Sequence, residues 1–219
     1  MTSPNQIANE SLTSQSADCT LTVTFTHSVP DVLRLIYSVH NHGTSALYLC
    51  NQLYSVPEEN SSTTQRAIAV LPNLVHVQVV DEGVKVEKSI TNLSFHDGVS
   101  VLDIPCLTRL EPGQDHEQAL DLSLPLVPYK VHSSRPSPLP PAPLPLLFEL
   151  GYFIDSRELQ PFVREVKTVA GSAYCLEPFM AGKQQLIAVG PFHQHVPTVN
   201  GAGNGLKQMV SDAAWTPWG

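Results

Sequence analysis

The chain has 219 residues, of which 42% are hydrophobic and 15% are charged, whereas about a quarter of the residues of an average globular protein are charged. Its 19 prolines, against roughly 11 at the average frequency, argue against a long helix, a coiled coil or a charge-rich disordered chain. With 12 Lys and Arg against 20 Asp and Glu, the formal net charge is −8. This is the wrong sign for a protein that gains affinity by neutralising phosphates, so no nucleic-acid partner is expected.

The first residues lack the features of a signal peptide, because no basic residue precedes Arg34 and the segment 1–17 is polar. No run approaches 18 consecutive apolar residues, so the sequence predicts a cytoplasmic protein with no transmembrane helix and no membrane partner. The cysteines include no Cys-x-x-Cys pair. We therefore expect Cys19, Cys50, Cys106 and Cys175 to be reduced and mostly buried thiols rather than disulfides.

Alternation of apolar and polar residues predicts the first strands. Thr20–His27 has Leu, Val and Phe on one side and Thr on the other, which is typical of a half-buried strand. Alternation resumes over Leu33–Val39, and turn residues at 41–45 lead into Ala46–Tyr54. These two runs are expected to form a hairpin.

A second hairpin is predicted where Val75–Val79 is followed by the turn Asp81–Gly83 and by further alternating valines. Beyond it, the leucine stripe of Leu120–Leu126 indicates another strand. Because Pro125 has no amide hydrogen, this strand is expected at the edge of a sheet or to end there.

The second half of the chain contains both strands and weak helical patterns. Leu146–Ile154 is apolar on nearly both faces, which predicts a central strand, and Gln185–Gly190 is expected to add a last one. A helix is predicted over Pro161–Ala170, although its β-branched residues fit a strand almost as well. Helical spacing also occurs at Leu206–Ala213, in the C-terminal tail.

These patterns together predict a mainly β fold, an antiparallel β-sandwich of seven to nine strands with minor helix. At fold level the arrangement is similar to immunoglobulin-like sandwiches, in the tyrosine-bearing strand Phe148–Phe153, the Asn-x-Gly turn and the Pro-Gly turn before the leucine stripe. The resemblance implies an immunoglobulin-like or related sandwich and no particular function. We expect residues 1–18 to be a flexible extension, 19–196 a single domain and 197–219 a Gly-rich tail.

Two His-x-His pairs are candidates for a metal site. His40 with His42, and His193 with His195, would each project from one face of a strand. Four imidazoles brought together could bind Zn or Cu. The alternative is that all four are exposed or hydrogen-bonded histidines, because both pairs lie near turn residues.

The sequence contains no local signature of a catalytic site. His96-Asp97-Gly98, and His116 between Asp115 and Glu117, are interpreted as turns, because adjacent residues of a strand point to opposite faces. A triad assembled from distant residues leaves no such signature. A metal-independent hydrolase or isomerase therefore stays a third hypothesis.

The segment Arg135–Pro145 holds six prolines and is expected to form a polyproline II rod without ladder hydrogen bonds. Arg135, Pro138 and Pro141 match the Arg-x-x-Pro-x-x-Pro spacing of ligands of SH3-type domains. The rod would otherwise serve as a connector that crosses the sandwich.

Both tryptophans of the chain, Trp215 and Trp218, lie close to its last residue. They are expected either to dock back on the domain or to anchor a partner. Our first hypothesis is a non-catalytic binding or assembly protein that acts through protein–protein interaction or self-association, with no cofactor. The alternative is a Zn- or Cu-binding protein that uses the two His-x-His pairs.

Overall fold

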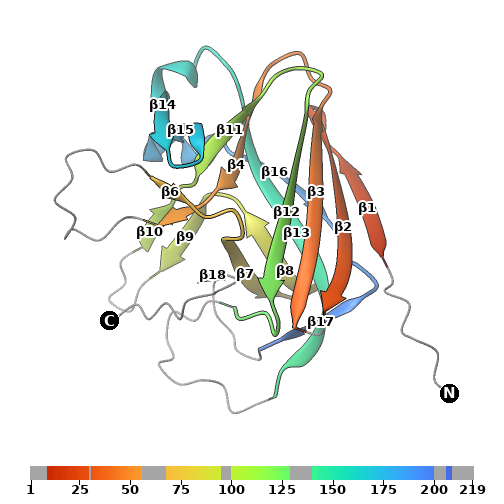
Figure 1. Ribbon diagram of the computed structural model, residues 1–219. Coiled ribbons are helices and arrows are strands. Elements are labelled where there is room, and N and C mark those ends of the chain that lie inside the picture. Colours follow the sequence, from red (N-terminus) through yellow and green to blue (C-terminus); the bar gives the residue numbers. More distant parts are fainter. Residues whose placement is uncertain are drawn as a thin grey trace.

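The computed structural model describes residues 9–29, 31–55, 68–94, 100–128, 140–199 and 206–208. These residues form a mainly β protein in which two sheets pack face to face, as predicted (Figure 1). Helix is limited, in the described part, to two 3₁₀ segments, η1 (Gln160–Phe162) and η2 (Pro178–Lys183).

The first sheet has four antiparallel strands in the order β1-β2-β3-β12. The strands are β1 (Glu10–Gln15), β2 (Cys19–Val29), β3 (Val32–Asn41) and β12 (Asp115–Ser123). The alternation in β2 has the predicted effect, since Leu21, Val23 and Phe25 are all fully buried. The leucine stripe is an edge strand that ends before Pro125, also as expected.

The second sheet is larger and is built around one long strand. Its order is β14-β15-β11-β4-β13-β8-β7-β18, with β16 and β17 also paired to β13. The strands are β4 (Leu47–Gln52), β7 (Val75–Val80), β8 (Gly83–Lys88), β11 (Cys106–Leu110), β13 (Ala142–Ile154), β14 (Val163–Thr168), β15 (Gly171–Leu176), β16 (Gln185–Val189), β17 (His195–Thr198) and β18 (Leu206–Gln208). Two small ladders pair β5 (Tyr54–Ser55) with β6 (Ala69–Val70) and β9 (Thr91–Ser94) with β10 (Ser100–Asp103).

The predicted central strand, the second hairpin and the strand over Gln185–Gly190 are confirmed, although β17 and β18 follow that strand, which was expected to be the last. The three confirmed elements correspond to β13, to the antiparallel pair β7 and β8, and to β16. One pair departs from the antiparallel expectation, because β13 runs parallel to β8. The described strands also outnumber the seven to nine expected, and they do not establish an immunoglobulin-like arrangement.

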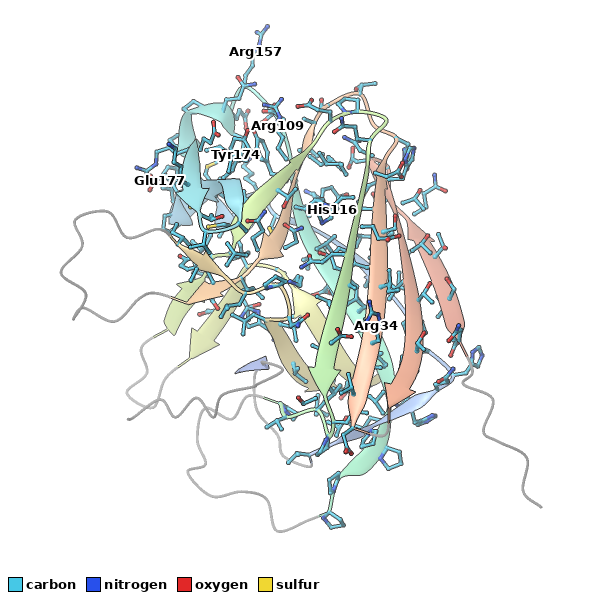
Figure 2. All side chains as sticks on the ribbon, viewed as in Figure 1. Arg34, Arg109, His116, Arg157, Tyr174 and Glu177 are labelled. Carbon is cyan, nitrogen blue, oxygen red and sulfur yellow. The ribbon has the colours of Figure 1, made fainter. Side chains whose placement is uncertain are left out.

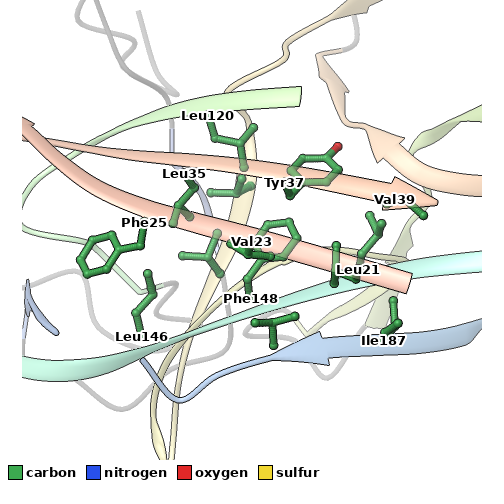
Figure 3. Close-up of a cluster of buried hydrophobic side chains, with 14 of the residues drawn as sticks. Leu21, Val23, Phe25, Leu35, Tyr37, Val39, Leu120, Leu146, Phe148 and Ile187 are labelled. Carbon is green, nitrogen blue, oxygen red and sulfur yellow. The ribbon is translucent and has the colours of Figure 1, made fainter. Parts of the chain in front are cut away.

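The core lies between the two sheets (Figure 3). Tyr37 of β3 stacks on Phe148 of β13 with ring centroids 5.1 Å apart, which joins the middle of one sheet to the middle of the other. A smaller apolar cluster lies on the other side of the second sheet, beneath η2; its buried members are Tyr48, Cys50, Leu107, Phe153, Leu159, Leu176 and Met180.

The first expected hairpin is wrong. Leu33–Val39 lies in β3, which pairs with β2 and β12, whereas Ala46–Tyr54 contains β4, which pairs with β11 and β13 of the other sheet. The turn residues therefore carry the chain between the sheets. Asn41 holds this crossing, because its side-chain amide donates to the carbonyl oxygens of Ser45 and Leu110, both at 3.0 Å.

Both helical expectations are corrected. Pro161–Ala170 contains the end of η1 and the strand β14, which pairs along its length with β15. Ladder pairing and the β-branched residues outweigh a weak helical spacing. Leu206–Gln208 likewise forms β18 on the edge of β7, and the residues after it lie outside the described part.

The proline-rich rod is wrong for its last residues, because Ala142–Pro145 begins β13 and pairs with β17. Pro143 lies opposite Pro197, whose carbonyl oxygen accepts from the amide of Leu126, 2.8 Å away on the other side of β17. The N–H and C=O of one strand residue point the same way. The backbone nitrogen of Pro197 therefore also points away from β13. Pro143 and Pro197 form a non-hydrogen-bonded pair, at which neither strand needs an amide hydrogen.

The sheet begins before the expected domain boundary, because β1 starts at Glu10 rather than at Cys19. β17 and β18 likewise extend pairing into the segment expected as a tail. No helix among the described residues is long and apolar enough to cross a membrane.

Candidate functional site

The two His-x-His pairs are held at opposite ends of β1. His42 Nε2 lies 3.4 Å from the amide nitrogen of Gln15, whereas His193 Nδ1 lies 2.7 Å from Glu10 Oε1. Glu10 and Gln15 are the first and last residues of this strand, about 17 Å apart at 3.4 Å per residue. The four imidazoles are therefore not gathered around one ion.

The remaining two histidines of these pairs have local partners. His40 Nδ1 lies 2.9 Å from Asp115 Oδ1, and His195 Nδ1 lies 3.0 Å from the carbonyl oxygen of His193. Within the described ranges there is no group of three or more His, Cys, Asp or Glu side chains that could hold a metal ion.

The other predicted binding residues lie mostly outside the described residues. This is so for Arg135, Pro138, Trp215 and Trp218. Pro141 is described, and it is exposed immediately before β13.

A polar pocket of about 160 Å³ opens where β12 of the first sheet meets the second sheet. Asn51 and Gln52 of β4, Thr108 of β11, and His116 and Gln118 of β12 contribute most of its polar groups. The end of β14, the turn after it and the start of β15 supply another wall through Thr168, Ala170 and Ser172. Figure 2 shows His116 in the space between β12 and the strands of the second sheet.

The side chains of the inner wall form a chain of hydrogen bonds in which each group donates to the next. The Gln52 amide donates to Thr108 Oγ1 at 2.7 Å, and that hydroxyl donates to Asn51 Oδ1 at 2.8 Å. Because Asn51 Oδ1 is thereby the acceptor, its amide nitrogen is the group that faces His116 Nε2 at 2.8 Å. His116 Nε2 is consequently an acceptor, and the ring hydrogen lies on Nδ1.

A buried lysine lies behind this wall. Lys88, at the end of β8, is fully buried, and its Nζ donates at 2.8 Å to the carbonyl oxygens of Asn51 and Pro72. Burial lowers the pKa of Lys88 to about 7.

The pocket holds His116 in its neutral form. Burial, and secondarily the charge of Lys88, lowers the pKa of His116 below its usual value. On the same strand, Gln118 accepts a hydrogen bond from the buried Tyr37 hydroxyl and donates to the Pro72 carbonyl oxygen at 3.2 Å. The groups around the opening are therefore hydrogen-bonding and uncharged.

A larger hollow, of about 260 Å³, lies beside η2. Phe153, Leu159 and Met180, which belong to the second apolar cluster, form part of its wall. Its ionic groups, Glu158 and Lys183, are 3.7 Å apart and largely exposed, so they do not converge on a ligand. The smaller polar pocket gathers more hydrogen-bonding side chains and is therefore the candidate site.

No motif of the sequence predicted this pocket, and the turn predicted at His116 is wrong. His116 lies within β12 and not in a turn, because the Pro-Gly turn ends before Asp115 and the strand starts there. One signal was available, since Lys88 continues the spacing of the buried Val84 and Val86 and so had to face inward. The polar residues of β4 and β11 carried no such signal.

Comparisons with protein families, with curated proteins and with solved structures found no significant match to this chain.

Proposed function

We propose that this protein is a non-catalytic binding protein whose polar pocket accepts an uncharged side chain of a partner protein. The observation that carries the proposal is the hydrogen bond from the Asn51 amide to His116 Nε2. A general base needs a lone pair that is directed at the substrate. In His116 the only such lone pair is already engaged, which leaves the ring as a hydrogen-bond donor through Nδ1.

The lining favours an uncharged polar ligand. The amide of Gln52 and the hydroxyl of Ser172 can each donate and accept. The Thr108 hydroxyl is already bonded to Gln52 and Asn51, and the one nearby amine, Lys88, donates to two backbone carbonyl oxygens. A volume of about 160 Å³ is below the roughly 300 to 1,000 Å³ of typical small-molecule sites, which suits a single side chain.

The rim favours a protein as the source of that side chain. Val169 is 68% exposed at the turn whose neighbours Thr168 and Ala170 line the pocket. A polar socket beside an exposed apolar side chain resembles the centre and border of a protein–protein interface, where apolar contact and a few hydrogen bonds act together.

The test uses the ¹⁵N-labelled protein and blocked amino acids, the N-acetyl N-methylamides of Asn, Gln, Ser and Thr. We expect at least one of them to cause saturable NMR shifts of the Asn51 and Gln52 side-chain amides. Ser172→Arg, which adds a bulky side chain at the exposed wall, should abolish the shifts. Ala17→Arg, at an exposed turn between β1 and β2, adds the same side chain away from the pocket and should retain them.

Two results would reject the proposal. One is the absence of saturable shifts at the pocket, or shifts that Ser172→Arg leaves unchanged. The other is binding of glucose at these amides with no response to any blocked amino acid, which would make the pocket a sugar site instead.

A further inference from the structure

Two of the four free cysteines face each other across neighbouring strands. Leu107 of β11 is paired with Tyr174 of β15, so Cys106 and Cys175, one position further along the antiparallel ladder, lie opposite each other. Their sulfur atoms are 3.5 Å apart. Figure 2 labels Tyr174, the residue that precedes Cys175 in β15.

The backbone at this pair already has the spacing of a disulfide. Opposite residues of antiparallel strands have Cα atoms about 4.5 to 5.5 Å apart. Disulfides span Cα separations of about 4.4 to 6.8 Å, so rotation of the two side chains suffices to bring the sulfurs together. We propose that Cys106 and Cys175 form a reversible disulfide when the protein meets a peroxide.

The surroundings assign different roles to the two thiols. Arg164 of β14 lies opposite Cys175 on its other side, so a cation, the Cys175 sulfur and the Cys106 sulfur form a row across three strands. The hydrogen bond from Cys106, with a smaller effect of Arg164, lowers the pKa of Cys175 to about 7, whereas the pKa of Cys106 is raised. Cys175 is the attacking thiolate and Cys106 the resolving thiol.

Solvent access separates Cys175 from the other three cysteines. Cys175 is half-buried, whereas Cys19, Cys50 and Cys106 are buried. Burial raises the pKa of both Cys19 and Cys50, which keeps them as unreactive thiols. Oxidation is therefore expected to begin at Cys175 alone.

The reaction balances with hydrogen peroxide as the oxidant. The Cys175 thiolate attacks one peroxide oxygen, the O–O bond breaks, and hydroxide leaves while Cys175 becomes a sulfenic acid. The Cys106 sulfur then attacks the Cys175 sulfur, the S–O bond breaks, and the proton of Cys106 leaves with the hydroxyl as water. Two thiols are oxidised to one disulfide, and one peroxide is reduced to two molecules of water.

The first experiment uses the unaltered full chain. The reduced protein is treated at neutral pH with one equivalent of hydrogen peroxide, denatured, alkylated with N-ethylmaleimide, digested and analysed by mass spectrometry. We expect a Cys106–Cys175 cross-linked peptide, a mass lower by about 2 Da before alkylation, and reversal by dithiothreitol. Cys19 and Cys50 should remain fully alkylated. Recovery of all four cysteines as alkylated thiols, or a cross-link between two chains, would overturn the proposal.

Variants test the order of the two steps. In Cys106→Ser, the sulfenic acid of Cys175 has no resolving thiol and should be trapped by dimedone. In Cys175→Ser, Cys106 should remain a thiol, and Cys19→Ala should behave as the unaltered protein. Oxidation of Cys106 in Cys175→Ser at the unaltered rate would show that Cys175 is not the attacking group. The unaltered chain alone decides whether the disulfide forms, so that result does not depend on how the variants fold.

Discussion

The side-chain amide of Asn51 donates to Nε2 of His116 over 2.8 Å and thereby joins β4 of the second sheet to β12 of the first. The two residues are 65 positions apart in the chain. Their contact determines which ring nitrogen of His116 accepts a hydrogen bond.

Asn51→Asp should raise the pKa of His116. In the unaltered protein we expect a neutral ring with its hydrogen on Nδ1, because the Asn51 amide faces Nε2. A carboxylate at the same place would instead stabilise the imidazolium. Long-range ¹H–¹⁵N spectra across a pH titration report both the tautomer and the pKa. His40, which already faces Asp115, is the internal control. A charged His116 at pH 7 in the unaltered protein would contradict the assignment.

Lys88→Met should remove a pH dependence of stability. The pKa of Lys88 is about 7 in the fold and about 10.4 in the unfolded chain, so between these values the unfolded chain binds more protons. The free energy of unfolding of the unaltered protein should therefore rise from pH 7 to pH 10, by several kcal/mol at about 1.4 kcal/mol per unit of pKa difference. The stability associated with the neutral amine is present above the unfolded pKa and lost as the pH falls toward 7.

Urea unfolding at a series of pH values measures this slope. Lys183→Met removes a lysine whose side chain is 66% exposed, and it should keep the slope of the unaltered protein. If Lys88→Met keeps that slope as well, Lys88 is not the group responsible.

Lys85→Met should destabilise the protein more at neutral than at acidic pH. Lys85 Nζ lies 2.8 Å from Glu87 and 2.9 Å from Glu149, and all three side chains are largely buried. Removing the ammonium leaves two carboxyls near each other without a counter-charge, at a cost of about 3 to 5 kcal/mol.

The pH dependence follows from Glu149. Burial raises the pKa of Glu149 even with Lys85 present, and loss of Lys85 would raise it further. A raised folded pKa contributes stability at low pH that is lost as the pH rises through it. Thermal unfolding at pH 4 and pH 7 should show the larger loss at pH 7, and Lys85→Met/Glu149→Gln should recover part of it. Equal losses at both pH values would contradict this account.

Gly83→Ala should be far more damaging than Gly113→Ala. Gly83 has a φ of +148°, and a Cβ there would lie 2.1 Å from the carbonyl oxygen of Pro145, on the neighbouring strand. Gly113 has a φ of +75° with no atom within 4 Å of such a Cβ, so alanine adds only backbone strain of about 1 to 2 kcal/mol. Thermal unfolding of the two variants compares the effect of backbone strain alone, in Gly113→Ala, with the effect of strain plus a steric clash, in Gly83→Ala. Similar melting temperatures would mean that β8 and β13 can separate without cost.

The alternating pattern of the sequence alone was enough to identify β2, β3, β7, β8 and β12 as strands and to show which of their faces are buried, whereas β14 and β18 were predicted as helices. A strand repeats every two residues, so the order of side chains in Leu21, Val23 and Phe25 is enough to assign the core face. The length and apolar character of Leu146–Ile154 were likewise enough to place β13 at the centre of a sheet. These properties are local, which is why they can be predicted without knowing any partner strand.

Only the tertiary structure decided which strands pair and which polar groups meet. β3 and β4 are neighbours in sequence, but β4 enters the second sheet because both of its faces are buried there. The pocket depends on this crossing, since it brings Asn51 to Thr108 and His116 from 57 and 65 positions away. Polar residues carry no periodic signal, and the free energy that brings them together comes from burying the two sheet faces against each other.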